Sequence, residues 1–119
     1  MLKSTSQNPH YKKSQSLGLA AEVSVIEKMK HNSWSLSFQR ARTKIAEIDL
    51  IFEKQNRVAL IEVKALNNSW RAFERIGVKQ TQKLQVNLIF LASQFKEFKF
   101  FAAICWVDKK GKVYFVEVS

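Results

Sequence analysis

The sequence predicts one domain of the α/β class, in the α+β arrangement, with a mixed central sheet flanked by helices. The chain has 119 residues, the length of a single domain, and its hydrophobic share of 46% is enough for one core. Two segments repeat apolar residues at helical spacing, and five others alternate apolar and polar residues as strands do. Short connections between neighbouring strands predict hairpins, so antiparallel strand pairs should combine with helices.

The first predicted element is a helix that either Ser14 or Ser16 can cap and that ends near Lys30. Its inward stripe is expected to be a set of residues at helical spacing: Leu19, Val23, Ile26 and Lys30. Glu22 lies beside this stripe, one turn before Ile26. Its carboxylate is therefore either a solvated group at the edge of the buried face or a group directed at a site.

Three strands are expected next, because apolar and polar residues alternate over residues 33–41, 45–53 and 57–66. The connection Lys54-Gln55-Asn56 is short enough to join the last two strands as a hairpin. These strands should therefore lie side by side and antiparallel.

A second helix is expected over residues 77–94, with an apolar face at helical spacing: Leu84, Leu88, Leu91 and Phe95. Gln80 lies one turn before Leu84 on the same face. Two closing strands are expected over residues 98–107 and 112–118, joined as a hairpin. The predicted order is helix, three strands, helix, two strands.

Charge is the strongest signal in the composition, with 20 Lys and Arg against 10 Asp and Glu, a net charge of +10. A polyanionic partner such as nucleic acid follows, because each neutralised phosphate releases counterions. Charge alone does not name the partner, since ribosomal, membrane-surface and other basic proteins share it. Residues 1–13 are expected to form a flexible basic arm, and residues 14–119 the single domain.

Several functional classes are disfavoured by what the sequence lacks. Residues 1–16 are polar, unlike a secretory signal, and no apolar stretch is long enough to cross a bilayer, so we expect a cytoplasmic protein without a membrane partner. Cys105 is the only cysteine and lies in an apolar run, which favours a small buried side chain over a catalytic thiol. His10 and His31 have no metal-ligand spacing and receive no role.

Carboxylates interrupt the two most apolar strands. Alternation places Glu47 and Asp49 on one face of the strand over residues 45–53, and Glu62 and Lys64 on one face of the next. Carboxylates in such runs are costly unless they are paired or bind a cation. Glu47 has the simpler alternative of pairing with a nearby basic side chain.

The hairpin can bring Asp49 and Glu62 together, where the two carboxylates repel unless a divalent cation lies between them. Oxygen ligands suit Mg²⁺ or Mn²⁺, and the carbonyl of Val63 and waters would fill the remaining positions. Lys64 would lie beside the cation, where its ammonium could orient an attacking water or stabilise charge on a phosphate. The alternative is an ordinary hairpin with an Asp49–Lys64 or Glu62–Lys64 ion pair.

One motif resembles that of the PD-(D/E)XK nuclease superfamily: Asp49, then a twelve-residue spacer, then Glu62-Val63-Lys64. The similarity to the bacterial YraN-like family, itself similar to archaeal Holliday-junction resolvases, extends from about Gly18 to Val107. Three runs carry it: Leu17-Gly18-Leu19-Ala20-Ala21-Glu22, Ala46-Glu47-Ile48-Asp49-Leu50-Ile51 and Ile61-Glu62-Val63-Lys64.

The resemblance implies a restriction-endonuclease-like αβββαβ core and a DNA endonuclease that depends on one Mg²⁺ or Mn²⁺ ion and is selective for junctions or branched DNA. Asp49 and Glu62 match the metal carboxylates of the superfamily, and Lys64 matches its catalytic lysine. Glu22 matches an acidic residue on a helix that supports the metal indirectly. Gln80 matches a polar position on the following helix that faces the site.

Two other functions stay open. One is a DNA-binding module of the same fold with weak or no cleavage, suggested because the family's early basic residue after Lys64 is absent here. The other is a structural or ribosome-associated basic protein, which predicts that the acidic residues and Lys64 do not cluster. A symmetric homodimer would suit junction cutting, with residues 113–118 as a pairing edge, and a monomer is equally open.

Tryptophans offer a further route to DNA, because their rings can stack on unpaired bases. Trp34 and Trp106 lie in predicted strands, which favours positions in the core. Trp70 lies in a predicted loop beside Arg71, where a DNA contact is as plausible as a packing role.

Overall fold

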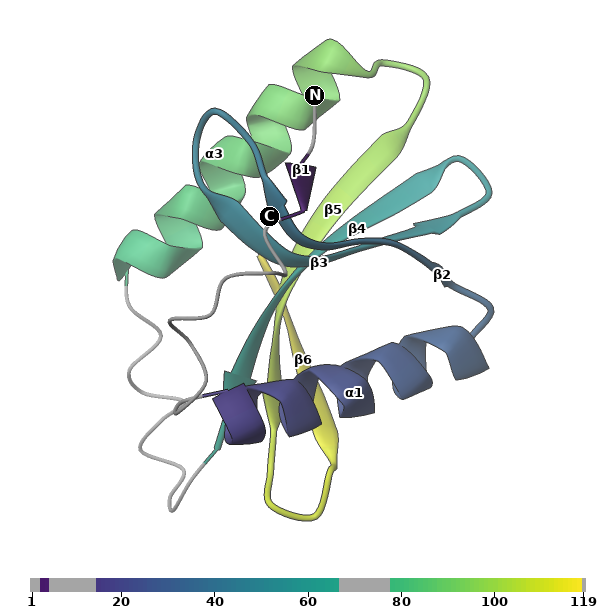
Figure 1. Cartoon of the computed structure of the whole chain (residues 1–119). Coiled ribbons are helices and arrows are strands. Elements are labelled where there is room, and N and C mark those ends of the chain that lie inside the picture. The colour runs from purple at the N-terminus through teal and green to yellow at the C-terminus, as the bar shows by residue number, and fades with distance from the viewer. Residues whose placement is uncertain (1–2, 5–14, 67–77, 119) are drawn as a thin grey trace.

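The computed structural model of the chain describes residues 3–4, 15–66 and 78–118 (Figure 1). It confirms the predicted α/β class and the order of helix, three strands, helix and two strands. The elements are β1 (Lys3–Ser4), α1 (Gln15–His31), β2 (Ser35–Arg42), β3 (Glu47–Lys54), β4 (Arg57–Ala65), α3 (Val78–Gln94), β5 (Lys99–Val107) and β6 (Val113–Val118).

The described strands form one mixed sheet in the order β1-β2-β3-β4-β5-β6. Neighbouring strands are antiparallel except β4 and β5, which run parallel. The parallel pair follows from connectivity, because the segment between β4 and β5 contains α3 and returns the chain to the starting end of the sheet. Lys3 and Ser4 pair with Arg42 and Ala41, and the other residues of the predicted N-terminal arm lie outside the described residues.

The two helices cover opposite faces of the sheet, as Figure 1 shows. The core accordingly has two halves. The buried residues of the α1 side are Ala21, Val25, Met29, Leu50, Phe52, Ala59, Ile61, Ala103, Cys105 and Val107. Those of the α3 side are Ala41, Ile48, Ile51, Val58, Leu60, Leu84, Leu91, Ala102, Ile104, Trp106 and Val118. The burial of Cys105 and Trp106 confirms the core positions favoured for them.

The face that α1 presents to the sheet differs from the prediction. Leu19 and Val23 are 43% and 51% exposed, and Lys30 is exposed, so three of the four predicted inward residues face outward. The buried stripe is instead formed by Ala21, Val25 and Met29, with Ile26 packed at its border. Both sets have helical spacing, so periodicity could not choose between them. The small side chain of Ala21 lies on the buried stripe, next to Glu22.

The apolar face predicted for the second helix is confirmed. Leu84 and Leu91 are buried, and Leu88 and Phe95 pack against the same cluster. Asn87 is also buried on this helix, with 1% of its surface exposed. None of the helices that the structure describes is long and apolar enough to cross a membrane.

Candidate catalytic centre

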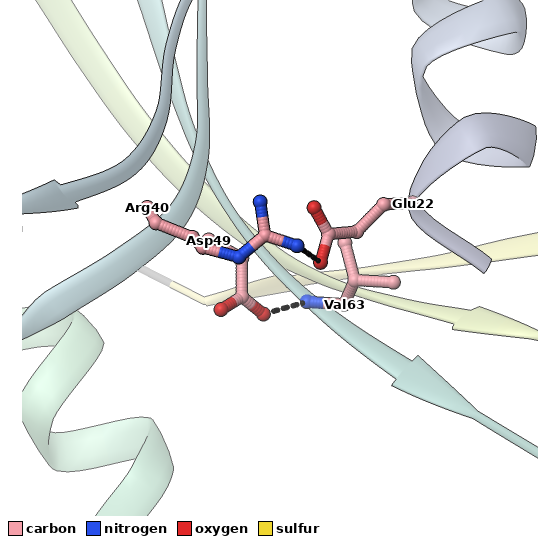
Figure 2. A network of polar contacts seen from close by, with 4 residues as sticks. All are labelled: Glu22, Arg40, Asp49 and Val63. Carbon is pink, nitrogen blue, oxygen red and sulfur yellow. Dashed lines mark hydrogen bonds and ion pairs between the residues drawn. The ribbon is translucent and has the colours of Figure 1, made fainter. Parts of the chain in front are cut away.

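The centre lies where β3 and β4 separate. Their regular pairing extends from Lys54 opposite Arg57 to Leu50 opposite Ile61. At the next residue of β3 the Asp49 side chain joins the strands, because Asp49 Oδ2 accepts a hydrogen bond of 2.8 Å from the backbone N–H of Val63 (Figure 2). This bond fixes the Asp49 carboxylate beside the run Glu62-Val63-Lys64.

The alternation of β3 is interrupted at this point. Strict alternation would place Ile48, Leu50 and Phe52 on one face of the strand. Leu50 and Phe52 pack on the α1 side of the sheet, whereas Ile48 packs on the α3 side. The change lies at Asp49, where the regular pairing with β4 has ended.

Asp49 and Glu62 are brought together as the hairpin predicted. Burial, the charge of Asp49 and a hydrogen bond with the Asp49 side chain raise the pKa of Glu62 to about 9. Lys64 opposes this rise, with its Nζ 3.9 Å from Glu62 Oε1. Without a metal, the surroundings of Glu62 therefore favour its protonated form, which can donate a hydrogen bond to the Asp49 carboxylate.

Glu22 reaches this centre from α1 and binds Arg40 of β2. Arg40 Nη2 lies 2.9 Å from Glu22 Oε2, and the two side chains are only 19% and 12% exposed. The other oxygen, Glu22 Oε1, is buried and has no hydrogen-bond partner among the described residues. Burial raises the pKa of Glu22 to about 7, Arg40 lowers it, and Asp49 raises it further. Glu22 is thus part of the centre and not a solvated edge residue.

Arg40 was missed by the sequence analysis. Its backbone is left-handed, with φ of 49°, which is uncommon for a residue other than glycine. Figure 2 shows its guanidinium between Glu22 and Asp49. Alternation could not have found it, because Leu36 packs on the α1 side and Phe38 on the α3 side, with a register shift between them.

Other predicted residues lie at the edge of the centre, away from it or outside the described residues. Glu47 lies 3.8 Å from Arg42 in an exposed ion pair, as the simpler alternative expects, and its charge also acts on Glu22 and Glu62. Trp34 packs edge-on against Phe101, and Arg57 lies over its ring, which favours a packing role. The Gln80 side chain, Trp70 and Arg71 lie outside the described residues.

The donor set of the centre fits a hard cation only in part. Within the described residues, no three His, Cys, Asp or Glu side chains are arranged closely enough to hold a metal together. Two observations nevertheless fit a cation: Glu22 Oε1 is buried and has no partner among the described residues, and the Asp49 and Glu62 carboxyl groups lie close together. The donors are oxygens, the type that Mg²⁺ and Mn²⁺ prefer.

Comparison with known proteins places the chain in a family. A sequence model described as "Uncharacterised protein family UPF0102" matches residues 21–105, more than half of the chain. A UPF0102 protein of Ruegeria pomeroyi is 33% identical over 105 residues, which cover 84% of each chain.

Two further relatives match shorter segments. A UPF0102 protein of Roseobacter denitrificans is 36% identical over 67 residues, covering 56% of this chain and about half, 52%, of its own length. A UPF0102 protein of Granulibacter bethesdensis is 27% identical over 81 residues, covering 68% of this chain and 51% of its own. The chain therefore belongs to the UPF0102 (YraN-like) family, a family of the PD-(D/E)XK, restriction-endonuclease-like superfamily.

Proposed function

We propose that the protein is a metal-dependent DNA endonuclease that hydrolyses phosphodiesters and is selective for branched DNA. The observation that carries the proposal is the convergence of Asp49 and Glu62, close enough for a side-chain hydrogen bond, with Lys64 Nζ 3.9 Å from Glu62 Oε1. A purely structural hairpin has no need for two carboxylates at one point, because their repulsion costs free energy.

Asp49 and Glu62 would hold one Mg²⁺ or Mn²⁺ ion, with Glu22 supporting it and the Val63 carbonyl as a further predicted ligand. When bound, such an ion lowers the pKa of a coordinated water and neutralises charge on the scissile phosphodiester. Val63 supports this assignment in another way, because its N–H fixes the Asp49 carboxylate. Arg40 positions Glu22 by binding one of its oxygens and leaving the other unpaired.

The remaining residues act on the substrate. Lys64 is 28% exposed, so its ammonium can reach a phosphate oxygen or an attacking water and still remain beside Glu62. The net charge of +10 supports a polyanionic substrate, because lysines and arginines replace the counterions of the DNA backbone.

Cleavage of a panel of DNA substrates tests the proposal. Wild type with Mg²⁺ or Mn²⁺ should cut a four-way junction or flap faster than linear duplex, and Glu62→Gln and Lys64→Ala should each lose at least about 100-fold in rate. Glu97→Gln, which removes an exposed carboxylate, is the matched control and should cut at the wild-type rate. Cleavage by Glu62→Gln at the wild-type rate, or no cleavage of any substrate by wild type, would overturn the endonuclease assignment.

Calorimetry separates metal binding from catalysis. Asp49→Asn should lose Mn²⁺ binding, because it keeps the shape of the side chain and removes its charge. Lys64→Ala should retain binding, since the lysine serves the water and the phosphate. Equal, negligible binding by wild type and Asp49→Asn would contradict the metal assignment.

A DNA-binding module of the same fold is the second candidate. It is favoured by the finding that no three-ligand group is assembled within the described residues. It predicts that branched DNA binds equally well in EDTA and in Asp49→Ala, and that no metal ion accelerates cleavage.

A further inference from the structure

A groove lies beside the proposed catalytic centre, between α1 and the β5–β6 turn. It has a volume of about 640 Å³. Its lining includes Ala20 and Ala21 of α1, Leu66 after β4 and Val107 at the end of β5, with Lys109 and Lys110 contributed by the turn. We call this cavity the α1 groove.

The α1 groove adjoins the proposed centre through two elements. Ala21 lines the groove and precedes Glu22 on α1, and Ala65 lines it and follows Lys64 on β4. Ala65 packs on the α1 side of the sheet, so Lys64, its neighbour on the strand, points to the opposite face. The groove and the side chains of the centre therefore share two elements, α1 and β4.

The β5–β6 turn is held rigidly against α1. Asp108 Oδ1 accepts hydrogen bonds of 2.9 Å from the backbone N–H groups of Lys110 and Lys112, so its charge is used within the turn. Gly111 has φ of +85°, and a Cβ added there would lie 3.4 Å from Ser24 Oγ of α1. The turn thus presents exposed Lys109 and Lys110 from a fixed backbone.

We propose that the α1 groove binds the unpaired strand of branched DNA, an inference that rests on the proposed function. The groove combines apolar side chains with lysines, which suits a nucleotide whose base is free and whose phosphate is charged. A duplex would leave the apolar hollow unfilled, because its bases are paired and stacked inside while its phosphates lie outside.

The size and lining of the groove define the binding further. Its volume is that of a small-molecule pocket, which accommodates a nucleotide unit and not a double helix. None of the described side chains that line it is aromatic, so stacking does not select particular bases. Binding should therefore be insensitive to sequence and sensitive to salt.

Fluorescence anisotropy in EDTA, where no cutting occurs, tests the proposal with single-stranded, flap and blunt duplex DNA over a salt series. The variant Lys109→Ala/Lys110→Ala should bind the single strand and the flap about tenfold more weakly. Its salt slope for the single strand should fall by about 0.7 for each phosphate that a lysine no longer neutralises. Blunt duplex should bind this variant as tightly as it binds the wild-type protein.

Lys96→Ala/Lys99→Ala is the matched control, because it removes the same charge from exposed residues near the start of β5. It should leave the preference for flap over duplex unchanged. Ala20→Trp keeps both groove lysines and fills the hollow from an exposed helix position, so it should lose flap binding selectively.

Equal weakening of duplex and flap by the lysine variant, or flap binding at the wild-type level in Ala20→Trp, would overturn the assignment of an unpaired strand. The binding result is independent of catalysis. Selective loss of flap binding alongside a wild type that cuts nothing would support the groove and contradict the endonuclease.

Discussion

At the scale of single residues, Arg40 is the least expected part of the proposed centre. It brings a guanidinium to the place where Glu22 approaches Asp49, and its left-handed backbone costs about 1–3 kcal/mol. Such a conformation persists only where the surrounding structure stabilises it. The pair with Glu22 is a compensating interaction, since both side chains are mostly buried. We infer that Arg40 supplies part of the positive charge that a cation would otherwise provide.

Replacing Arg40 should therefore increase the response to metal. Arg40→Gln should lower the stability of the metal-free protein by about 1–3 kcal/mol, because Glu22 loses its partner. It should also enlarge the stabilisation by Mn²⁺, since the ion then offsets more uncompensated negative charge. Thermal denaturation with and without Mn²⁺ measures both effects.

Arg42→Gln is the control for this substitution. It removes the same charge from an ion pair whose arginine is 62% exposed, so a change of no more than about 1 kcal/mol is expected. If the two variants match in stability and in their response to Mn²⁺, Arg40 has no special relation to the site.

At the scale of secondary-structure elements, sequence patterns predicted existence and order well. Long periodic segments identified both helices and five strands, and the hairpin register correctly brought Asp49 beside Glu62. The face of α1 was not predictable, because apolar residues occur on both of its candidate stripes. The role of Arg40 was not predictable either, since the direction of its side chain depends on a left-handed backbone that the residue type does not predict.

A buried polar contact joins α3 to the β2–β3 connection just before the proposed centre. The Thr43 hydroxyl donates a hydrogen bond to the side-chain oxygen of Asn87 and accepts one of 3.0 Å from the backbone N–H of Ile45. Asn87 is 1% exposed, so losing this partner would leave a buried polar group unsatisfied. The contact therefore ties the position of α3 to the start of β3.

A double-mutant cycle tests this link. Thr43→Val should destabilise the protein by about 1–3 kcal/mol, because it leaves the buried Asn87 side chain without this partner. Asn87→Leu should cost less, because the Thr43 hydroxyl can still donate to the Ala46 carbonyl. The double variant should cost less than the sum, with a coupling of at least about 0.5 kcal/mol. Urea denaturation supplies the free energies, and Thr43→Ser, which keeps the hydroxyl, should stay near wild type. Strictly additive losses would show that the two residues stabilise the fold independently.

At the scale of the whole molecule, a half-buried acidic centre lies in a chain with a net charge of +10. This arrangement follows from the sheet, in which β4 and β5 are central and apolar. At Asp49, β3 separates from β4, and Glu22 reaches this point from α1. Repulsion among the carboxylates opposes folding, and protons relieve it when no metal is present. The free energy of unfolding should therefore depend on whether the carboxylates of the centre are ionised, protonated or bound to a metal.

The stability of the metal-free protein should decrease as pH rises from about 4.5 to about 9. The pKa of Glu62 is raised from 4.5 to about 9 and that of Glu22 from 4.5 to about 7. Between the unfolded and folded values, the native state binds more protons than the unfolded state. Each rise in pH therefore favours unfolding, by up to about 1.4 kcal/mol per pH unit for each group. Between pH 7 and 9 only Glu62 contributes.

Urea denaturation at intervals from pH 5 to pH 9 in EDTA measures this slope. Glu62→Gln should flatten it between pH 7 and 9, because glutamine cannot ionise, and Glu22→Gln should act only below about pH 7. Glu97→Gln, an exposed control, should retain the wild-type slope. Saturating Mg²⁺ should flatten the wild-type curve, since the ion offsets the negative charge that protonation of Glu62 otherwise removes, and it binds only the folded state. A flat wild-type curve in EDTA would mean that the carboxylates of the centre are not coupled, and a slope that persists in Glu62→Gln would place its origin elsewhere.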